Sequence, residues 1–234
     1  MKSPIIRPPL QALLEAPSYR IAEAALYLAI PTATLRSWTR GQPYRLQDGR
    51  VRRFMPIIAL APGEPPRLSF MNLLEAHVVN ALRRKGLPFQ KVRRALEYLN
   101  KHFPSPHPLL DRAFLTDGWS ILIDHMRTLV NITSDGQIEM KEIVAAHLQR
   151  IARNAQGLPV QFYPFTRSGH ADDPRSVVID PRLSFGRPVL VGTGVPVEEI
   201  VGRHKAGESI RALAEDYDRQ PEDIEEALRF LEAA

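Results

Sequence analysis

A proline and a glycine bracket the segment that most restricts how this chain can fold. Pro31 lacks a backbone N–H and crowds the residue before it, so a preceding helix must end there. Gly41 ends a helix that follows, since glycine adopts the left-handed backbone conformation at little cost. The residues between them, TATLRSWTR, are therefore predicted to form one short helix with the Thr32 side chain as its N-terminal cap.

This short helix has an apolar side and a polar side. At about 100° per residue, Leu35 and Trp38 lie on the same side. Apolar residues also recur at helical spacing in the preceding run, 19–29, so the pair predicts a helix-turn-helix whose second helix reads the DNA major groove. The alternative is that Arg36 and Arg40 of this helix are only a solvent-exposed face without a DNA contact. The predicted DNA contacts on the helix are Thr32, Ala33, Arg36, Ser37 and Arg40.

A basic hairpin is predicted directly after this helix. Asp48-Gly49 is a strong turn signal between two short segments of residues 44–57. The second arm carries Arg50, Arg52 and Arg53, which we expect to act as a wing that contacts phosphates or the minor groove. The alternative, a strand edge protected by charge, would use Lys or Glu as readily as Arg.

Charge is divided unevenly along the chain. The 234 residues carry a net charge of +5, but residues 1–103 hold 17 Lys and Arg against 6 Asp and Glu. Residues 104–234 hold 14 basic against 20 acidic side chains. A basic part joined to an acidic part indicates a nucleic-acid-binding region followed by a region of different function.

Two further helices are predicted to complete residues 1–103. Ser69 can cap the first helix and Gly86 can end it, while Pro88 suits the first turn of the second. Three basic residues of the second helix are expected largely off its apolar stripe: Lys91, Arg93 and Arg94.

Residues 104–170 are predicted to form a small β/α segment. A proline-rich linker, 104–112, is followed by two Asp-Gly turns that indicate a small antiparallel sheet. A helix at Lys141–Asn154 and a strand within LPVQFYPF come next. The polar stretch Thr166–Arg175 is expected to be a mobile boundary.

Residues 171–234 are predicted to form a small acidic domain. Two short strands, Val177–Ile179 and Pro188–Val191, precede three helices in a second helix-turn-helix pattern. The predicted helices are Val197–Ala206, Ser209–Tyr217 and Pro221–Leu231. Because the last helix is acidic, a protein partner is favoured over DNA. The whole chain is thus expected to be mainly α with a small β component: a winged helix-turn-helix, a middle β/α segment and a three-helix domain.

Enzymatic and membrane functions are disfavoured by the sequence. There are no cysteines, and no apolar run is long enough to span a bilayer, so a soluble cytoplasmic protein is expected. The turn at Gly192–Gly194 lacks the Lys-Ser/Thr of a phosphate-binding loop. His102 and His107 lie in or beside a proline-rich linker without carboxylate companions. We therefore expect no catalytic residue, no metal and no cofactor.

Two stretches of the chain resemble known bacterial families. YRIAEAALYLAIPTATLRSWTRG, RVRRFMPI and the next two predicted helices resemble the winged helix of MerR-type regulators over about residues 18–100. Residues 175–232 resemble a small antitoxin domain with an Asp-Pro pair, a Gly-x-Pro turn and a Gly-Thr-x-(x)-Pro-Val turn before three helices. Gly194 stands where that domain usually has arginine, and Phe185 where it usually has glycine. The resemblance implies a PIN-like ribonuclease toxin as partner.

The expected function is that of an antitoxin that neutralises such a toxin and represses its own operon by binding operator DNA. A homodimer is expected, joined through the middle segment or the helix Phe89–His102. The acidic last helix could mimic RNA, or an arginine could reach the toxin's carboxylates, or the helix could simply close its own core. The candidate partner contacts are Arg187, Arg203, Glu222, Asp223, Glu225 and Glu226. The alternatives are a transcription regulator that responds to a small ligand in the middle segment and an excisionase-like architectural factor.

Overall fold

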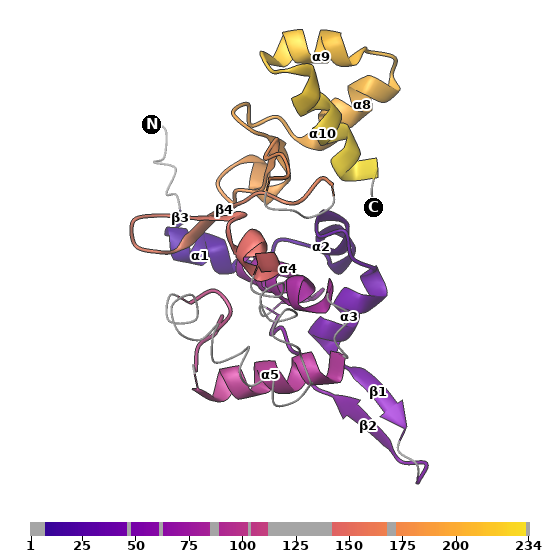
Figure 1. The fold of residues 1–234 in the computed structure, drawn as a ribbon, viewed down its shortest axis with the longest axis vertical. Coiled ribbons are helices and arrows are strands. Elements are labelled where there is room, and N and C mark those ends of the chain that lie inside the picture. Colours follow the sequence, from indigo (N-terminus) through magenta and orange to yellow (C-terminus); the bar gives the residue numbers. More distant parts are fainter. Residues whose placement is uncertain are drawn as a thin grey trace, which may run out of the picture.

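The protein is mainly helical, with three two-stranded antiparallel sheets among the residues described here. The computed structural model describes residues 8–45, 48–60, 63–84, 89–102, 104–111, 142–167 and 172–232. Figure 1 shows the N-terminal helices at the centre, the β1–β2 hairpin projecting at one end and the last three helices at the other. The predicted mainly α fold with a small β component is confirmed.

The predicted helix-turn-helix is formed by α2 (Ile21–Tyr27) and α3 (Thr32–Arg40), with α1 (Leu10–Glu15) before them. The capping role predicted for Thr32 is wrong. Pro31 is the N-cap residue, its carbonyl accepts the Leu35 N–H at 3.2 Å, and no side chain caps the helix. Thr32 is instead the first helical residue, and Pro31, with φ −59° and ψ 133°, is the extended residue directly before the helix.

Helix α4 (Phe70–Arg84) runs through the middle of the molecule (Figure 1). The predicted cap is confirmed: Ser69 and Asn72 each accept the other's backbone N–H, at 3.1 and 3.2 Å. The predicted apolar stripe is buried, but so is every residue from Phe70 to Val79. α4 is therefore the central helix of the core rather than a surface helix with one buried side.

Helix α5 (Phe89–His102) differs from the prediction at one position. Arg94 is exposed as expected, but Arg93 is buried. Its guanidinium donates to the Met55 carbonyl and lies 5.1 Å above the Phe54 ring. The apolar part of the arginine side chain can pack in the core because its polar end finds an acceptor there. Gly86 and Pro88, the predicted helix boundaries, lie outside the described residues.

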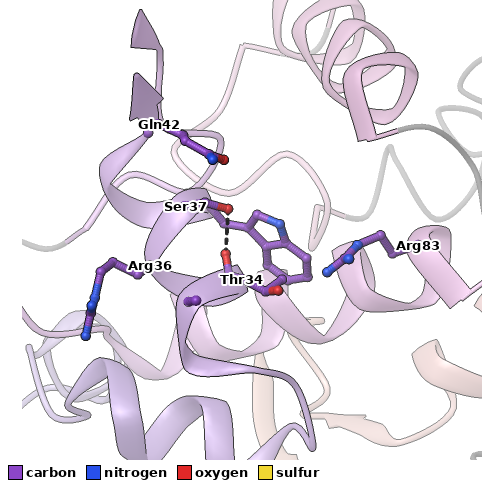
Figure 2. Close-up of a pocket in the computed structure, with 8 residues that line it drawn as sticks. Thr34, Arg36, Ser37, Gln42 and Arg83 are labelled. Carbon is purple, nitrogen blue, oxygen red and sulfur yellow. Dashed lines mark hydrogen bonds between the residues drawn. The ribbon is translucent and has the colours of Figure 1, made fainter. Parts of the chain in front are cut away.

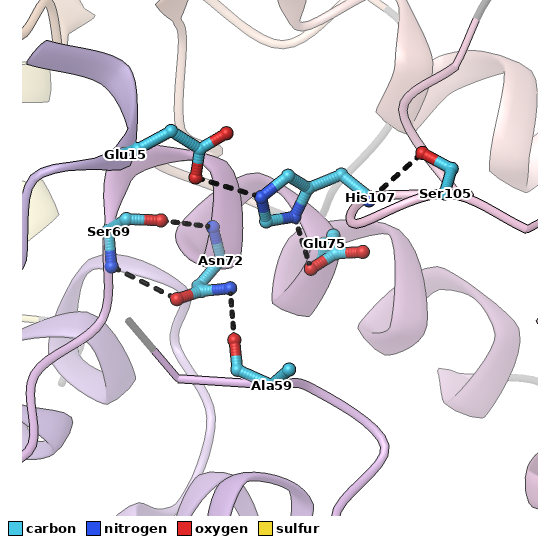
Figure 3. A network of polar contacts seen from close by, with 7 residues as sticks. All are labelled: Glu15, Ala59, Ser69, Asn72, Glu75, Ser105 and His107. Carbon is cyan, nitrogen blue, oxygen red and sulfur yellow. Dashed lines mark hydrogen bonds and ion pairs between the residues drawn. The ribbon is translucent and has the colours of Figure 1, made fainter. Parts of the chain in front are cut away.

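The predicted linker after α5 is part of the core, and it places a histidine between two carboxylates (Figure 3). His107 Nδ1 lies 2.9 Å from Glu75 Oε2, and Nε2 lies 3.0 Å from Glu15 Oε2. The prediction that His107 has no carboxylate companion is therefore wrong. Burial lowers the pKa of His107, but the hydrogen bonds and charges of the two carboxylates outweigh it and raise the pKa to about 9.

The middle segment contains a short helix, 142–148, followed by β3 (Ile151–Arg153) and β4 (Pro159–Phe162). The predicted sheet within 113–140 lies outside the described residues. The strand predicted in LPVQFYPF is confirmed as β4, but the helix predicted to reach Asn154 ends earlier. The chain reverses at Arg150 to place β3 beside β4, with the Ile151 side chain still buried.

Arg150 also explains why the predicted mobile boundary is partly packed. Its buried guanidinium donates to four backbone carbonyls, those of Tyr163, Pro164, Asp173 and Pro174. Thr166 and Asp173 are buried as well. The described parts of Thr166–Arg175 therefore make side-chain hydrogen bonds to the rest of the fold, and the mobility of this stretch stays a prediction.

The C-terminal elements follow the predicted order. They are β5 (Val177–Val178), a 3-10 turn at Ser184–Gly186, β6 (Val189–Leu190), α8 (Val197–Lys205), α9 (Ile210–Tyr217) and α10 (Pro221–Glu232). α10 also reaches the N-terminal region, where the Phe230 ring stacks on Tyr27 of α2 at 6.0 Å. One hydrophobic cluster thus extends from Leu14 to Phe230. The division at residues 103 and 170 remains a prediction about domains.

Candidate nucleic-acid interface

Helix α3 presents its polar side to the surface, as predicted. Leu35 and Trp38 are fully buried. Ala33, Arg36 and Arg40 are exposed, and Ser37 is half-buried. Two arginines one helical turn apart on an exposed, nine-residue helix have the placement of a recognition helix in a helix-turn-helix.

The end of α3 is fixed to the base of the hairpin. The Trp38 carbonyl accepts the N–H groups of Ile57 and Ile58, at 2.9 and 3.2 Å. Gly41 has φ +70°, and a Cβ on it would collide with the Phe54 carbonyl oxygen. Glycine is needed here for both its backbone conformation and its lack of a side chain. The hairpin therefore has a defined position relative to α3.

The predicted hairpin is formed by β1 (Gln42–Arg45) and β2 (Val51–Phe54). The rings of Tyr44 and Phe54 stack with 4.2 Å between their centroids, and the guanidinium of Arg93 in α5 also lies over the Phe54 ring. All three predicted arginines of the wing are exposed, but they are not equivalent. Arg50 is paired with Asp48 at 2.6 Å, and this contact holds the pKa of Asp48 below its usual range. Arg52 and Arg53 form no ion pair with any described residue.

A pocket of about 500 Å³ lies between α3, the start of β1 and the end of α4. Figure 2 shows Thr34, Arg36, Ser37, Gln42 and Arg83 around it. The Ser37 hydroxyl donates to the Thr34 carbonyl at 2.7 Å, so its oxygen remains an acceptor. No acidic residue is among those that line the pocket. The surface is thus suited to a phosphate or to the edge of a base.

Sequence reasoning missed Arg83 as part of this surface. It belongs to α4, more than forty positions from α3, and its guanidinium lies 5.9 Å above the Trp38 ring. The Arg83-Arg84-Lys85 run before Gly86 was the available signal, because a basic run at a helix end is typical of phosphate-contacting surfaces.

The candidate partner contacts in the C-terminal part lie in different environments. Arg203 is held by Glu208, Asp216 and Tyr217, whereas Arg187 is half-exposed and lies 3.8 Å from Glu198. Glu222 and Glu225 are exposed, and Asp223 accepts a hydrogen bond from Ser176 at 2.6 Å.

Glu226, predicted as a partner contact on an exposed side of the last helix, is instead buried. Its carboxylate is buried and accepts hydrogen bonds from Thr166, Arg167 and Arg229. Burial acts to raise the pKa of Glu226, but these donors outweigh it and the pKa is lower than usual. Glu226 therefore anchors the segment around Thr166 to α10.

Two absences are found among the residues that the structure describes. No group of three or more His, Asp or Glu side chains is arranged to hold a metal ion. Glu15 and Glu75, for example, contact opposite nitrogens of His107 and do not converge on one point. No helix in the same ranges is long and apolar enough to cross a bilayer.

The two ends of the chain match two family models. Residues 17–96 match a family described as "Putative DNA-binding HTH domain", and residues 177–231 match one described as "Protein of unknown function (DUF433)". The fold of α2 and α3 and the match over residues 17–96 thus define a helix-turn-helix protein, whose C-terminal part matches a second family.

Similarity to curated proteins covers almost the whole chain. It is 34% identical to "Putative antitoxin VapB45" of Mycobacterium tuberculosis, over 96% of the chain and 98% of that protein, and it belongs to the same family. It is also 24% identical to "Uncharacterized protein Rv2308" of the same organism, over 94% and 92%. The crystal structure of Rv2018 from Mycobacterium tuberculosis superposes with a TM-score of 0.68 at 31% identity, covering 92% of this chain and 99% of the other. The antitoxin family expected from the sequence is thereby confirmed.

Proposed function

We propose that the chain is the antitoxin of a toxin–antitoxin system, which binds operator DNA through α3 and the β1–β2 wing. The similarity to an antitoxin over the whole chain carries this proposal. The exposed arginines beside an anion-suited pocket support the DNA-binding half. We propose that the chain has no catalytic activity and acts in the cytoplasm. We also propose a homodimer whose two α3 helices bind two half-sites of the operator.

The DNA-binding half is tested by comparing two arginines with different roles. Arg36→Ala should cost about 1–3 kcal/mol of operator binding and change the sequence preference if Arg36 contacts a base edge. Arg52→Ala should instead weaken binding to all sequences alike and reduce the salt dependence by about one unit of slope. Unchanged operator binding by an Arg36/Arg40 double variant would refute the placement of α3 in the groove.

The toxin-binding half is assigned to the C-terminal domain, with a PIN-like ribonuclease as the partner. Two mechanisms fit the exposed residues. Glu222 and Glu225 could occupy a basic RNA groove of the toxin, or Arg187 could reach its metal-binding carboxylates. Arg203 is a weaker candidate because Glu208 and Asp216 already neutralise it.

Point variants separate these mechanisms better than removal of the whole domain. A deletion would expose Tyr27 and the segment held by Glu226, so it would damage the DNA-binding region as well. We therefore propose Glu222→Lys with Glu225→Lys, and separately Arg187→Ala, in the full chain co-expressed with the neighbouring gene product. Loss of neutralisation in the charge-reversed chain supports RNA mimicry, and loss in Arg187→Ala supports the arginine mechanism. If both variants neutralise fully, neither surface is the toxin contact.

A further inference from the structure

A second cavity, of about 200 Å³, lies on the inner side of the helix-turn-helix. One wall is the α2–α3 turn itself, residues 28–31, and another is formed by His77, Asn80 and Arg83 of α4. Phe165 and Arg167, from the segment after β4, line a further part of the cavity. Its volume is below the roughly 300–1,000 Å³ of most drug-sized sites, so only a small molecule would fit.

Flat rings cover much of the cavity wall. His77 packs against His147 and Phe162, each with 4.6 Å between ring centroids, and Phe165 lies 4.8 Å from His147. These side chains hold one another in place, and His147 Nδ1 is further fixed 2.8 Å from the Ile143 carbonyl oxygen. Rigid ring faces around a small volume favour a planar, aromatic body.

The polar groups of the cavity favour an anion. Two arginines line it, and none of its lining residues is Asp or Glu. Arg167 is balanced by Glu226, whereas Arg83 makes no ion pair with any described residue. The Asn80 amide also has no hydrogen-bond partner in the described part of the chain. A carboxylate could therefore pair with Arg83 and accept from Asn80 without displacing an existing contact.

Arg83 belongs to both the cavity and the DNA-facing pocket. In Figure 2 it extends toward the pocket that Thr34 and Ser37 line, and its guanidinium lies over the Trp38 ring. One guanidinium cannot make its full set of contacts to a ligand on the inner side and to a phosphate on the outer side. Occupation of the cavity would also press on the turn that orients α3.

We propose that this cavity binds a small planar organic anion, such as an aromatic carboxylate, and that the bound anion weakens operator binding by withdrawing Arg83 from the DNA-facing pocket. The proposal that an anion binds here rests only on the residues of the cavity. The regulatory effect rests on the proposed DNA-binding function of α3.

Calorimetry on the full chain tests the ligand site with benzoate and with benzamide, its neutral counterpart of the same shape. Benzoate should bind at least about tenfold more tightly, since charge-assisted hydrogen bonds are the stronger kind. Arg83→Gln should lose about tenfold in benzoate affinity, while Arg94→Gln, an exposed arginine of α5, should lose none. Equal affinity for the two compounds, absence of binding, or an unchanged Arg83→Gln variant would each overturn the site.

The regulatory effect is tested by titrating an operator fragment at constant ionic strength, with benzoate or an equal concentration of chloride. Benzoate should weaken DNA binding by the natural chain and leave that of Arg83→Gln unchanged. Equal DNA affinity with and without bound benzoate would overturn the regulatory effect. If instead the Arg36/Arg40 double variant binds operator DNA normally, the proposed DNA-binding role of α3 fails, and the calorimetric result is unaffected.

Discussion

His107 and Glu75 form a buried ion pair in which Nδ1 lies 2.9 Å from Oε2, within a chain segment that sequence patterns assign to a linker. Only about a tenth of either side chain is exposed. The pair joins residues 104–111 to α4, and Glu15 extends it to α1. The protonated ring of His107 therefore links three separate segments of the N-terminal region: residues 104–111, α4 and α1.

The stability of the fold should fall as the pH rises above neutrality. The pKa of His107 is about 9 in the folded chain against an ordinary value of 6.5, so the folded state binds this proton more tightly. The resulting stabilisation is complete below pH 6.5 and is lost as the pH rises through about 9. We expect a loss of about 1–3 kcal/mol over that range, measured by urea unfolding at several pH values. A His107→Gln variant should show a much flatter dependence in the same range.

Replacing His107 alone should lower the free energy of unfolding more than replacing His107 and Glu75 together. His107→Ala leaves the Glu75 carboxylate buried without a cation and should cost about 3–5 kcal/mol. Adding Glu75→Gln removes the buried charge and should restore part of that loss. His102→Ala is the matched control, because His102 is exposed and should change stability by less than about 0.5 kcal/mol. If the double variant is as unstable as His107→Ala, the buried charge is not the cause.

Gly41→Ala should displace the wing and weaken DNA binding. Its φ of +70° disfavours any side chain, and a methyl group there would collide with the Phe54 carbonyl. Gly49 also has positive φ, at +82°, but has open space around it. Gly49→Ala should therefore show only the backbone strain of about 1–3 kcal/mol, without loss of operator affinity. Equal operator affinity in the two variants would show that the close contact at Gly41 does not set the wing's position.

Glu226 and Glu225 are adjacent and should respond differently to substitution. Glu226→Ala removes the acceptor shared by Thr166, Arg167 and Arg229, and we expect a loss of about 1–3 kcal/mol in thermal or urea unfolding. Glu225→Ala, on an exposed side of the same helix, should stay within about 0.5 kcal/mol of the natural chain. A small effect of Glu226→Ala would mean that these contacts are exchanged for water without cost.

Local patterns predicted the elements whose cause is local. Pro31 and Gly41 bound α3 by their own backbone preferences, and Asp48-Gly49 lies in the connection between β1 and β2, where Gly49 has φ +82°. The same holds for the order of the last three helices. In the candidate site, the apolar and polar sides of α3 followed from helical spacing alone.

Residues with distant partners were assigned incorrectly. Arg93 bonds to a carbonyl 38 positions away, Glu226 to a hydroxyl 60 positions away, and His107 to carboxylates 32 and 92 positions away. A sequence pattern predicts that a charged side chain is exposed, because burying a charge without a partner costs much free energy. The partners of these three residues are distant in sequence, so their burial could not be predicted. Arg83 was missed for the related reason that its neighbours in the pocket beside α3 come from another element.

The stacking of Phe230 on Tyr27 joins the packing of α10 to that of α2. We expect a ligand that binds only the folded C-terminal part to favour the folded α2–α3 pair as well, by an amount set by its free concentration relative to its dissociation constant. Linkage is reciprocal, so a factor by which operator DNA changes the affinity for a protein partner must equal the factor by which that partner changes the affinity for DNA. A single pair of equilibrium titrations, with each ligand in the presence and absence of the other, would measure that factor twice.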